Sequence, residues 1–382
     1  MSAAQRNTLM LKGHAPIVPP VVWLGQSVRT TVVTRRYPAL AKACWMASLG
    51  DAVHRPRLIE RVFCGELRER LGAQGPIMLD SGGFTMMMKS QKLDIVEIAA
   101  IYNRTSAELC ISLDIPPLGR DRSHTRLRKY DETRSNLHYL AERLDPDRLV
   151  PVIHGTTVIE IAQNCERVME VHTRPRMVCL GGLVPLLRRT GRTFEARSRA
   201  FSWIRDCIAE VRRQFPRSLI HILGAGAPQT VSDVICCGAD STDSLAWRRA
   251  AGFGTIYLPG TSERFVASRS RARATSRPLL NASELEQLAA CACPACKEWP
   301  RLEDRINDLS NSYLARAAHN AFVVLSGVKS LALMRRKGTL VTTPSTHHTP
   351  RGTAPAASAG ACRPSQSSGR STGPAPPPDR RR

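Results

Sequence analysis

Short apolar segments that end in an acid, a histidine or paired glycines recur about every 30 residues along most of this chain, with helical patterns between them. The alternation predicts parallel strands joined by right-handed helical crossovers. Because about eight such strands are present and their polar ends would meet at one mouth, we predict a (β/α)8 TIM barrel rather than an open sheet. The predicted strands are residues 17–25, 77–80, 109–115, 149–155, 177–183, 219–226, 239–246 and 254–258.

Amphipathic spacing predicts the helices between these strands. A long helix over residues 194–215 should bury one apolar face, which consists of Phe201, Ile204, Ile208, Val211 and Phe215. Asp131 is predicted to cap the N-terminus of a helix over residues 131–144. Residues 21–49 carry no clear pattern of strands or helices.

Four regions are predicted from composition and pattern. Residues 1–15 should be a flexible N-terminus, and residues 16–277 should form the barrel. Residues 278–336 should form a small helical zinc-binding appendage. Residues 337–382 are basic and rich in Pro, Ser, Thr, Ala and Gly, which predicts a disordered tail.

The chain is strongly basic, with a formal net charge of +23 and a pI near 10.3. From Arg335 onward there are nine Lys and Arg residues and one acid, so about +15 remains on the folded part. Such a field attracts polyanions, and nucleic acid is the first partner to consider. The alternative is a solvated basic surface without a partner.

Most of the twelve cysteines stand singly inside apolar runs, which indicates small buried residues in a reducing compartment. The first residues contain no apolar core of signal-peptide length, and no stretch approaches the roughly 18 apolar residues of a membrane span. We therefore expect a cytoplasmic protein without a membrane partner.

The segment IMLDSGGF, residues 77–84, places Asp80 at the end of an apolar run and two glycines close behind it. Glycine allows a ligand to approach the backbone closely, and barrel enzymes keep their catalytic groups at the carboxyl ends of the strands. Ordinary turn chemistry is the alternative. Other predicted strands end at Asp114, at His154 and at Gly181-Gly182.

Basic residues follow several of these strand ends, and in a barrel the loops that carry them would surround one mouth. A basic rim around an acidic pocket suits a polynucleotide whose phosphates lie on the rim while one unit enters the pocket. The predicted nucleic-acid contacts are Arg120, Arg122, Arg126, Arg188, Arg189, Arg248 and Arg249.

Three cysteines close together, Cys291, Cys293 and Cys296, are followed by His319 in a predicted helix over residues 306–334. Three thiolates and an imidazole in a cytosolic protein suit tetrahedral zinc better than a disulfide. Since no open ligand position is implied, we expect the zinc to be structural. The alternative is three incidental cysteines and a histidine on a helix surface.

Together these motifs resemble the tRNA-guanine transglycosylase superfamily, enzymes that exchange a guanine in a polynucleotide for a 7-deazaguanine base. The resemblance covers residues 76–320, about two-thirds of the chain. The matching motifs are DSGGF at 80–84, SLDIP with Asp114, His154-Gly155 where the family has Gln-Gly, GGL at 181–183, HILGAG at 221–226, GADSTDS at 238–244 and the CxCxxC…H set.

The resemblance implies that Asp243 is the nucleophile and Asp80 the general acid and base. It also implies a free 7-deazaguanine base as second substrate, and a guanosine flipped out of its stack into the pocket. Asp240 is the alternative nucleophile, although a spacing of three residues would turn it to the other face of the strand. The implied base-contacting residues are Ser81, Gly82, Phe84, Asp114, His154, Gly181, Gly182 and Leu183.

Three departures from the family pattern bear on which polynucleotide is the substrate. Thr85 and His154 stand where the family has glutamines, and residues 245–254 replace a Pro-Thr-Arg-rich run that meets RNA. They favour the divergent DpdA-like branch that inserts 7-deazaguanines into DNA, and leave open whether an ATP-dependent partner protein takes part.

The alternatives are the same exchange on tRNA, a non-catalytic nucleic-acid-binding subunit, and an unrelated metal-dependent barrel hydrolase. A non-catalytic subunit would have little reason to keep Asp80, Asp114 and Asp243. The hydrolase would need several histidines at strand ends, where only His154 and His221 qualify.

Overall fold

The computed structural model describes residues 8–89, 91, 94–183, 194–267 and 277–340, which belong to one compact unit. Arg188 and Arg189 lie outside the described residues, as does the predicted tail from residue 341 onward.

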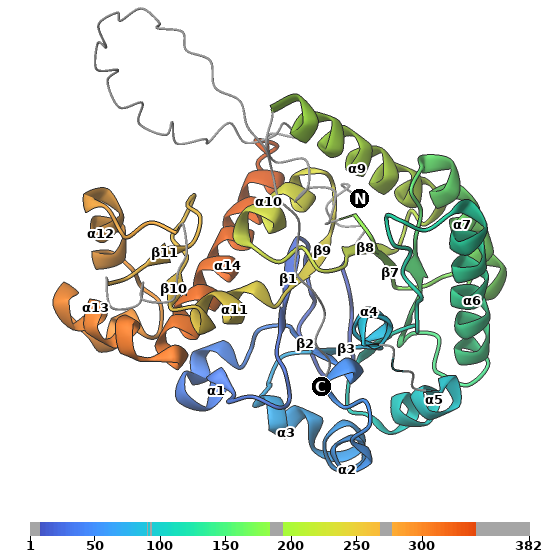
Figure 1. Cartoon of the computed structure of the whole chain (residues 1–382), viewed down its shortest axis with the longest axis horizontal. Coiled ribbons are helices and arrows are strands. Elements are labelled where there is room, and N and C mark those ends of the chain that lie inside the picture. Colours follow the sequence, from blue (N-terminus) through green and yellow to red (C-terminus); the bar gives the residue numbers. More distant parts are fainter. Residues whose placement is uncertain (1–7, 90, 92–93, 184–193, 268–276, 341–382) are drawn as a thin grey trace, which may run out of the picture. The chain divides into compact units, whose positions relative to one another are not determined.

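Parallel strands surround the centre of the molecule, with helices outside them (Figure 1). Neighbouring strands follow the order β5-β4-β3-β2-β1-β9-β8-β7-β6. Their bounds are β1 (Val21–Gly25), β2 (Trp45–Ser48), β3 (Ile77–Asp80), β4 (Leu109–Ile111), β5 (Leu149–Val150), β6 (Val152–Ile153), β7 (Met177–Leu180), β8 (Leu219–Ile222) and β9 (Ser241–Ser244).

The two ends of this order, β5 and β6, are halves of one strand. Pro151 separates them because proline has no N–H to donate to a strand ladder. The Ser112 N–H donates to the Val150 carbonyl on one side, and the Cys179 N–H donates to the Pro151 carbonyl on the other. The segment therefore closes the ring, and the predicted eight-stranded (β/α)8 barrel is confirmed.

The strand prediction differs from the structure in two places. The barrel contains β2, between β1 and β3, which was not predicted because it lies in the stretch 21–49 where no pattern was clear. The predicted last strand instead forms β10 (Thr255–Ile256), which pairs antiparallel with β11 (Arg264–Phe265) outside the barrel. The reason is that β9 already pairs with β8 and β1, so no edge remains for another strand.

Helices cover the outside of the barrel. The predicted inner face of α9 (Phe194–Gln214) is confirmed, since the five residues predicted for it are buried, with Phe215 directly after the end of the helix. The capping prediction for Asp131 is wrong, because α6 (Ser123–Ala141) begins earlier, after Arg122. The other helices are α1 (Val33–Arg36), α2 (Pro56–Leu58), a π-helical segment (Ile59–Glu66), α3 (Leu67–Leu71), α4 (Gly83–Met88), α5 (Ile95–Arg104), α7 (Val158–Val171), α10 (Pro228–Cys236), α11 (Ala246–Gly252), α12 (Ala282–Ala289), α13 (Leu302–Asn311) and α14 (Tyr313–Arg336).

Alternate strand residues separate into two apolar clusters, as the two-residue period of a strand requires. One cluster packs against the helices, and the other contains Trp23, Met78 and Cys179. Leu9 and Leu11 join this second cluster and are buried. The predicted flexible N-terminus is therefore packed from residue 8 onward, because its leucines add to an apolar core.

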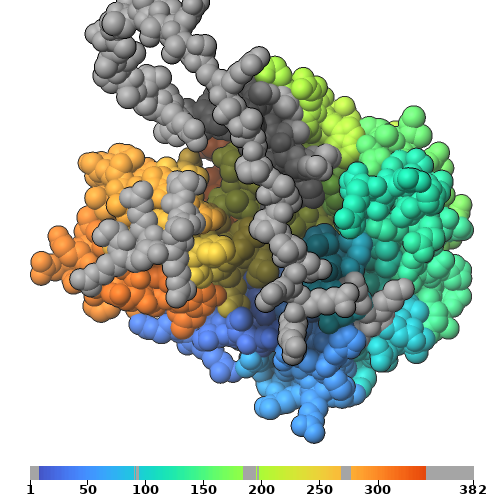
Figure 2. All heavy atoms as spheres, viewed as in Figure 1, coloured from blue at the N-terminus to red at the C-terminus, as the bar shows by residue number. Residues whose placement is uncertain are grey.

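The C-terminal appendage packs directly on the barrel, where its orange helices lie beside blue α1 and yellow α11 (Figure 2). The predicted helix over 306–334 is divided at Ser312, whose hydroxyl caps α14 by accepting from the Ala315 N–H at 3.1 Å. By length and composition α14 could cross a membrane, with a mean hydropathy of 1.3. One face of α14 is buried and contacts α11, α10 and β1.

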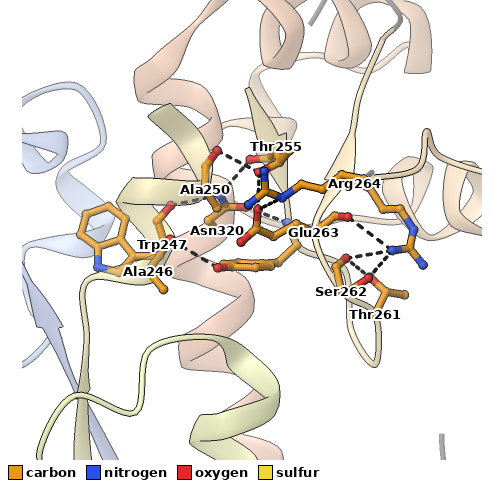
Figure 3. Close-up of polar contacts among 11 residues, drawn as sticks. Ala246, Trp247, Ala250, Thr255, Thr261, Ser262, Glu263, Arg264 and Asn320 are labelled. Carbon is orange, nitrogen blue, oxygen red and sulfur yellow. Dashed lines mark hydrogen bonds and ion pairs between the residues drawn. The ribbon is translucent and has the colours of Figure 1, made fainter. Parts of the chain in front are cut away.

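Asn320 on α14 joins the appendage to the segment that follows β9 (Figure 3). Its Nδ2 donates to the carbonyls of Trp247 and Thr255, both at 3.1 Å. Its Oδ1 accepts from the Tyr257 N–H at 2.8 Å. One fully buried amide therefore satisfies three backbone groups between α11 and β10.

Candidate active site

Three carboxylates lie at the carboxyl ends of barrel strands. Asp80 is the last residue of β3, Asp114 follows β4, and Asp243 is the third residue of β9. In a barrel these ends share one mouth, so the structure brings together the acids that the sequence singled out.

Asp80 is held in a site that favours its neutral form. Burial raises the pKa of Asp80 to about 7, and the negative charges of Asp114 and Asp243 add to the rise. Hydrogen bonds from the Ser48 hydroxyl, at 2.7 Å, and from Gly82 oppose it. A carboxyl group with this pKa can donate a proton and take it back near neutral pH.

The glycines behind Asp80 are required by close packing. Gly82 has a φ of +79°, and a Cβ there would lie 2.3 Å from the Gly50 nitrogen. A Cβ on Gly83 would lie 2.3 Å from the Asp114 carbonyl oxygen. The turn can therefore pass against Asp114 only without side chains.

One oxygen of Asp243 is held and the other is available. Oδ1 accepts a hydrogen bond from the Gly224 N–H at 2.6 Å and faces Nε2 of His221 at 3.4 Å. Oδ2 has no hydrogen bond to any residue that the structure describes. The Gly224 N–H and the His221 ring therefore fix the orientation of this carboxylate.

His221 lies fully buried below Asp243 in the barrel. Its Nδ1 is 2.9 Å from the Ser241 hydroxyl, and its Nε2 has no hydrogen-bond partner among the described residues. When the Ser241 hydroxyl donates to Nδ1, the Nε2 proton points towards Asp243.

Asp240, the alternative nucleophile, lies outside this site. It precedes β9, at the opposite end of the barrel from the acids. Its carboxylate is ion-paired with Arg212 and Arg335 and accepts from the Ile220 N–H at 3.0 Å. The spacing of three residues indeed separates it from Asp243.

Asp114 and His154 form a buried pair, with Nε2 of the imidazole 2.8 Å from Oδ2 of the carboxylate. Gly181 makes room for it, because a Cβ there would lie 2.5 Å from His154 Cε1. The other ring nitrogen, Nδ1, is buried without a partner in the described part of the chain.

The remaining predicted base contacts have mixed surroundings. Phe84 is 60% exposed, which leaves its ring free to stack on a ligand. The Gly181 N–H donates to the Ile153 carbonyl and so belongs to the barrel ladder. Gly182 follows it with a φ of +81°, and Leu183 is fully buried.

Buried polar atoms without partners gather near these acids. Within the described ranges they include the hydroxyls of Ser81 and Ser112, besides the two ring nitrogens named above. Leaving such atoms unpaired is costly, so their presence indicates a site that receives a polar ligand.

Sequence reasoning missed Ser48, Ser112 and Gly224. Ser48 lies in the unrecognised strand β2, and only register shows that it faces Asp80.

The predicted basic rim is only partly available to a ligand. Arg120, Arg122 and Arg249 are exposed. For Arg248 the prediction of a nucleic-acid contact is wrong, because its side chain is buried. It donates to the Tyr313 hydroxyl at 2.9 Å and the Thr31 carbonyl at 3.2 Å.

Arg126 is also engaged within the protein, since it pairs with Glu160 at 3.3 Å and donates to the Asp121 carbonyl. Its guanidinium holds α6 against the start of α7.

Cys291, Cys293, Cys296 and His319 converge in the appendage, with their ligand atoms within 4.8 Å of one another. The three sulfurs lie 3.5–3.6 Å from His319 Nδ1. An edge of about 3.6 Å is what a tetrahedron with zinc–sulfur and zinc–nitrogen bonds of ordinary length requires. His319 Nε2 donates to the Tyr257 carbonyl at 2.8 Å, which orients Nδ1 as a ligand. The group can therefore hold a metal ion.

A comparison with known families and proteins adds independent information. The family model described as queuine tRNA-ribosyltransferase matches residues 48–329. The tRNA-guanine(15) transglycosylase of Methanosarcina mazei is 25% identical over 285 residues, which are 72% of this chain and 51% of that protein. That of Methanothermobacter thermautotrophicus is 23% identical, over 75% of this chain and 40% of its own length. The queuine tRNA-ribosyltransferase of a Cyanothece species is 24% identical over 62% of each chain. The chain spans about half the length of the first relatives it matches.

Proposed function

Because this chain belongs to the queuine tRNA-ribosyltransferase family, we propose that it exchanges a guanine in a polynucleotide for a free 7-deazaguanine base. It is then a pentosyltransferase. The observation that carries the proposal is the pairing of Asp80, which can change protonation near neutral pH, with Asp243, which presents one free carboxylate oxygen.

In the first half of the reaction, Oδ2 of Asp243 attacks C1′ of the flipped guanosine. The C1′–N9 bond breaks, its electrons pass to the guanine, and the guanine takes a proton from Asp80. The product is a glycosyl ester on Asp243. Gly224 and His221 hold the other oxygen, so that Oδ2 keeps one direction of attack.

In the second half, the incoming 7-deazaguanine gives its N9 proton to the Asp80 carboxylate and attacks C1′. Asp243 leaves, and the starting protonation of both acids is restored. Asp80 must therefore act as acid and then as base, which a pKa of about 7 allows at neutral pH.

The base is read by polar groups next to these acids. Asp114 can accept from the guanine N1–H and 2-amino group through Oδ1, since its Oδ2 is engaged by His154. His154 Nδ1 and Ser112 Oγ, which have no hydrogen-bond partner among the described residues, can supply further contacts. Ser81, Gly82, Gly182 and Leu183 line the same turns, and Phe84 stacks on the base.

We propose that the metal of the appendage is structural zinc, and that residues 278–336 form a zinc subdomain. The four residues fill a tetrahedral set, so the ion would stabilise the fold and take no part in the chemistry. Free thiol ligands agree with a reducing compartment, and we propose a cytoplasmic location.

For the polymer we place tRNA first, because the relatives are named as acting on tRNA. DNA is the second candidate, and one observation favours it. The run after Asp243, where the family has residues that meet RNA, folds into α11, in which Trp247 and Arg248 are buried. The participation of an ATP-dependent partner protein belongs to the DNA alternative and stays a prediction.

Incorporation of radiolabelled guanine and 7-cyano-7-deazaguanine into tRNA and DNA, assayed in parallel, tests the proposal. We expect label in tRNA with the unaltered protein and none with Asp243→Ala. Label in DNA alone would establish the second candidate. Label in neither polymer, with binding retained, would favour the non-catalytic subunit.

A further inference from the structure

A second basic feature lies outside the acidic mouth, in the loops that follow β1 and β2. These loops enclose an open cavity of about 680 Å³. Four of its seven lining residues are arginines, namely Arg29, Arg55, Arg57 and Arg70, and none is an acid. None of the four was predicted from the sequence to contact a ligand.

Three of these arginines have side chains without a partner in the part of the chain that the structure describes. Arg29, Arg55 and Arg57 are exposed, and none of their guanidinium groups makes a hydrogen bond or ion pair with a described residue. Arg70 differs, because its Nε donates to the Val28 carbonyl at 2.7 Å and so fixes one wall. Gathering like charges without counter-charges is unfavourable, which indicates an anionic ligand.

The cavity adjoins the strands that carry the reaction. Strand β1 lies between β9, which holds Asp243, and β2, whose last residue Ser48 bonds Asp80. The two loops are joined where the Val28 N–H donates to Asp51 Oδ2 at 3.2 Å. Both loops leave the carboxyl ends of their strands, so Arg29, Arg55 and Arg57 follow strand ends on the side of the barrel that carries the acids.

We propose that this arginine cavity binds backbone phosphates of the polynucleotide, next to the guanosine that enters the acidic mouth. The cavity is far larger than one phosphate, and its guanidinium groups can each grip phosphate oxygens in pairs. Such contacts carry no sequence information and would hold the strand while one nucleotide is flipped. The inference rests on the proposed function and adds a second polymer contact to it.

The test compares two triple variants that remove the same charge. The cavity variant, Arg29→Gln/Arg55→Gln/Arg57→Gln, removes the three arginine charges that have no partner among the described residues. Lys42→Gln/Arg174→Gln/Arg217→Gln is the control, because these three exposed residues precede β2, β7 and β8 at the opposite end of the barrel. Dissociation constants for an unmodified tRNA transcript and a guanine-containing single-stranded DNA are measured over a range of salt concentrations, together with base exchange.

For the polymer that the unaltered protein exchanges, we expect the cavity variant to bind about tenfold more weakly or worse at moderate salt. The slope of log affinity against log salt should fall by about 2, since each lost phosphate contact removes roughly 0.7–0.9. KM for the free base and the melting temperature should not change. The control variant should keep the slope of the unaltered protein.

Three results would overturn the inference, and they are distinguishable. If exchange and polymer binding are normal in the cavity variant, the cavity proposal fails while the proposed function stands. The same holds if both triple variants lose slope equally, because the effect is then only net charge. If the unaltered protein neither binds nor exchanges on either polymer, the proposed function fails and this proposal fails with it.

Discussion

At the scale of single residues, Asp80 and Asp243 are both carboxylates at strand ends, yet their surroundings differ. Asp80 accepts hydrogen bonds from the Ser48 hydroxyl and Gly82 and lies beside two other carboxylates, whereas Asp243 accepts from the Gly224 N–H and faces a histidine. These different environments are the reason why we propose different tasks for the two groups, an acid and a nucleophile.

The raised pKa of Asp80 predicts how activity depends on pH. Release of guanine needs protonated Asp80, so kcat/KM for the polymer should fall about tenfold per pH unit above about 7. Asp80→Asn should abolish exchange while polymer binding remains. A pH profile that stays flat from pH 6 to 9 would contradict the acid role of Asp80.

The raised pKa of Asp80 also predicts how the free energy of unfolding depends on pH. The folded-state pKa of Asp80 lies above that of a free aspartate, near 4, so the folded protein binds this proton more tightly. The free energy of unfolding contributed by this group is therefore largest below pH 4 and is lost as the pH rises to about 7. Asp80→Asn avoids the loss and should be about 2 kcal/mol more stable than the unaltered protein at pH 8. Urea unfolding at pH 4 and pH 8 measures the difference, and equal pH dependence in both proteins would refute it.

His221 is predicted to position Asp243 rather than to contact the substrate. His221→Ala should lower kcat by about 10- to 100-fold, because the nucleophile loses one of its two restraints. KM for the polymer should stay nearly constant, and His221→Gln, which keeps an N–H donor, should recover part of the rate. Steady-state kinetics of the three proteins give the result. Equal losses in both variants would indicate that His221 serves packing alone.

At the scale of elements, much of the barrel follows from sequence, and the failures have physical causes. Strands whose apolar run ends in an acid, a histidine or paired glycines, such as β3, are visible because burial makes the run apolar and the polar end marks it. Strand β2 has the same length of four residues, but it ends at Ser48, so no such mark follows it. The antiparallel place of β10 depends on Asn320, more than 60 residues away, which no local pattern reveals.

The acids of the site were predictable because strand ends and glycine turns mark them. Their partners were not, since Ser48 and His221 reach the acids through strand register and the barrel's closure. Arg248 shows the opposite error. Its sequence neighbours suggest an exposed basic loop, but the helix α11 turns it towards Tyr313.

Asn320 is predicted to be the main polar connection between the appendage and the barrel. Asn320→Ala should lower the free energy of unfolding by about 2–4 kcal/mol, because three buried backbone groups lose their partner. Asn311→Ala is a suitable control, since Asn311 is exposed and its amide bonds only within α13. Chemical unfolding of both variants decides the point, and a loss for Asn320→Ala no larger than for Asn311→Ala would contradict it.

Loss of the metal should affect the appendage first. Cys293→Ser should purify without zinc and should be destabilised by at least about 3 kcal/mol, because a buried four-ligand group loses its ion. Cys236→Ser removes a half-buried thiol outside the group and should keep full zinc. Metal analysis of the purified proteins is the measurement. An unaltered protein that contains no zinc would refute the assignment.

At the scale of the whole molecule, charge and chemistry point to the same substrate. A net charge of +23 attracts any polyanion, but it cannot select a base. We propose that selection depends on the acids and on the buried polar atoms near them, where a single nucleotide would be enclosed. We therefore expect binding to be strong and salt-dependent for many nucleic acids, and exchange to occur only where guanine can be flipped out.

Isolation of the covalent intermediate tests the central claim most directly. The protein is incubated with the polymer that it exchanges, without an incoming base, then denatured, digested and analysed by mass spectrometry. We predict one nucleotide-linked peptide, modified at Asp243, in an amount equal to the guanine released, and none in Asp243→Ala. Guanine exchange without such an adduct, or an adduct at another residue, would contradict the proposed mechanism.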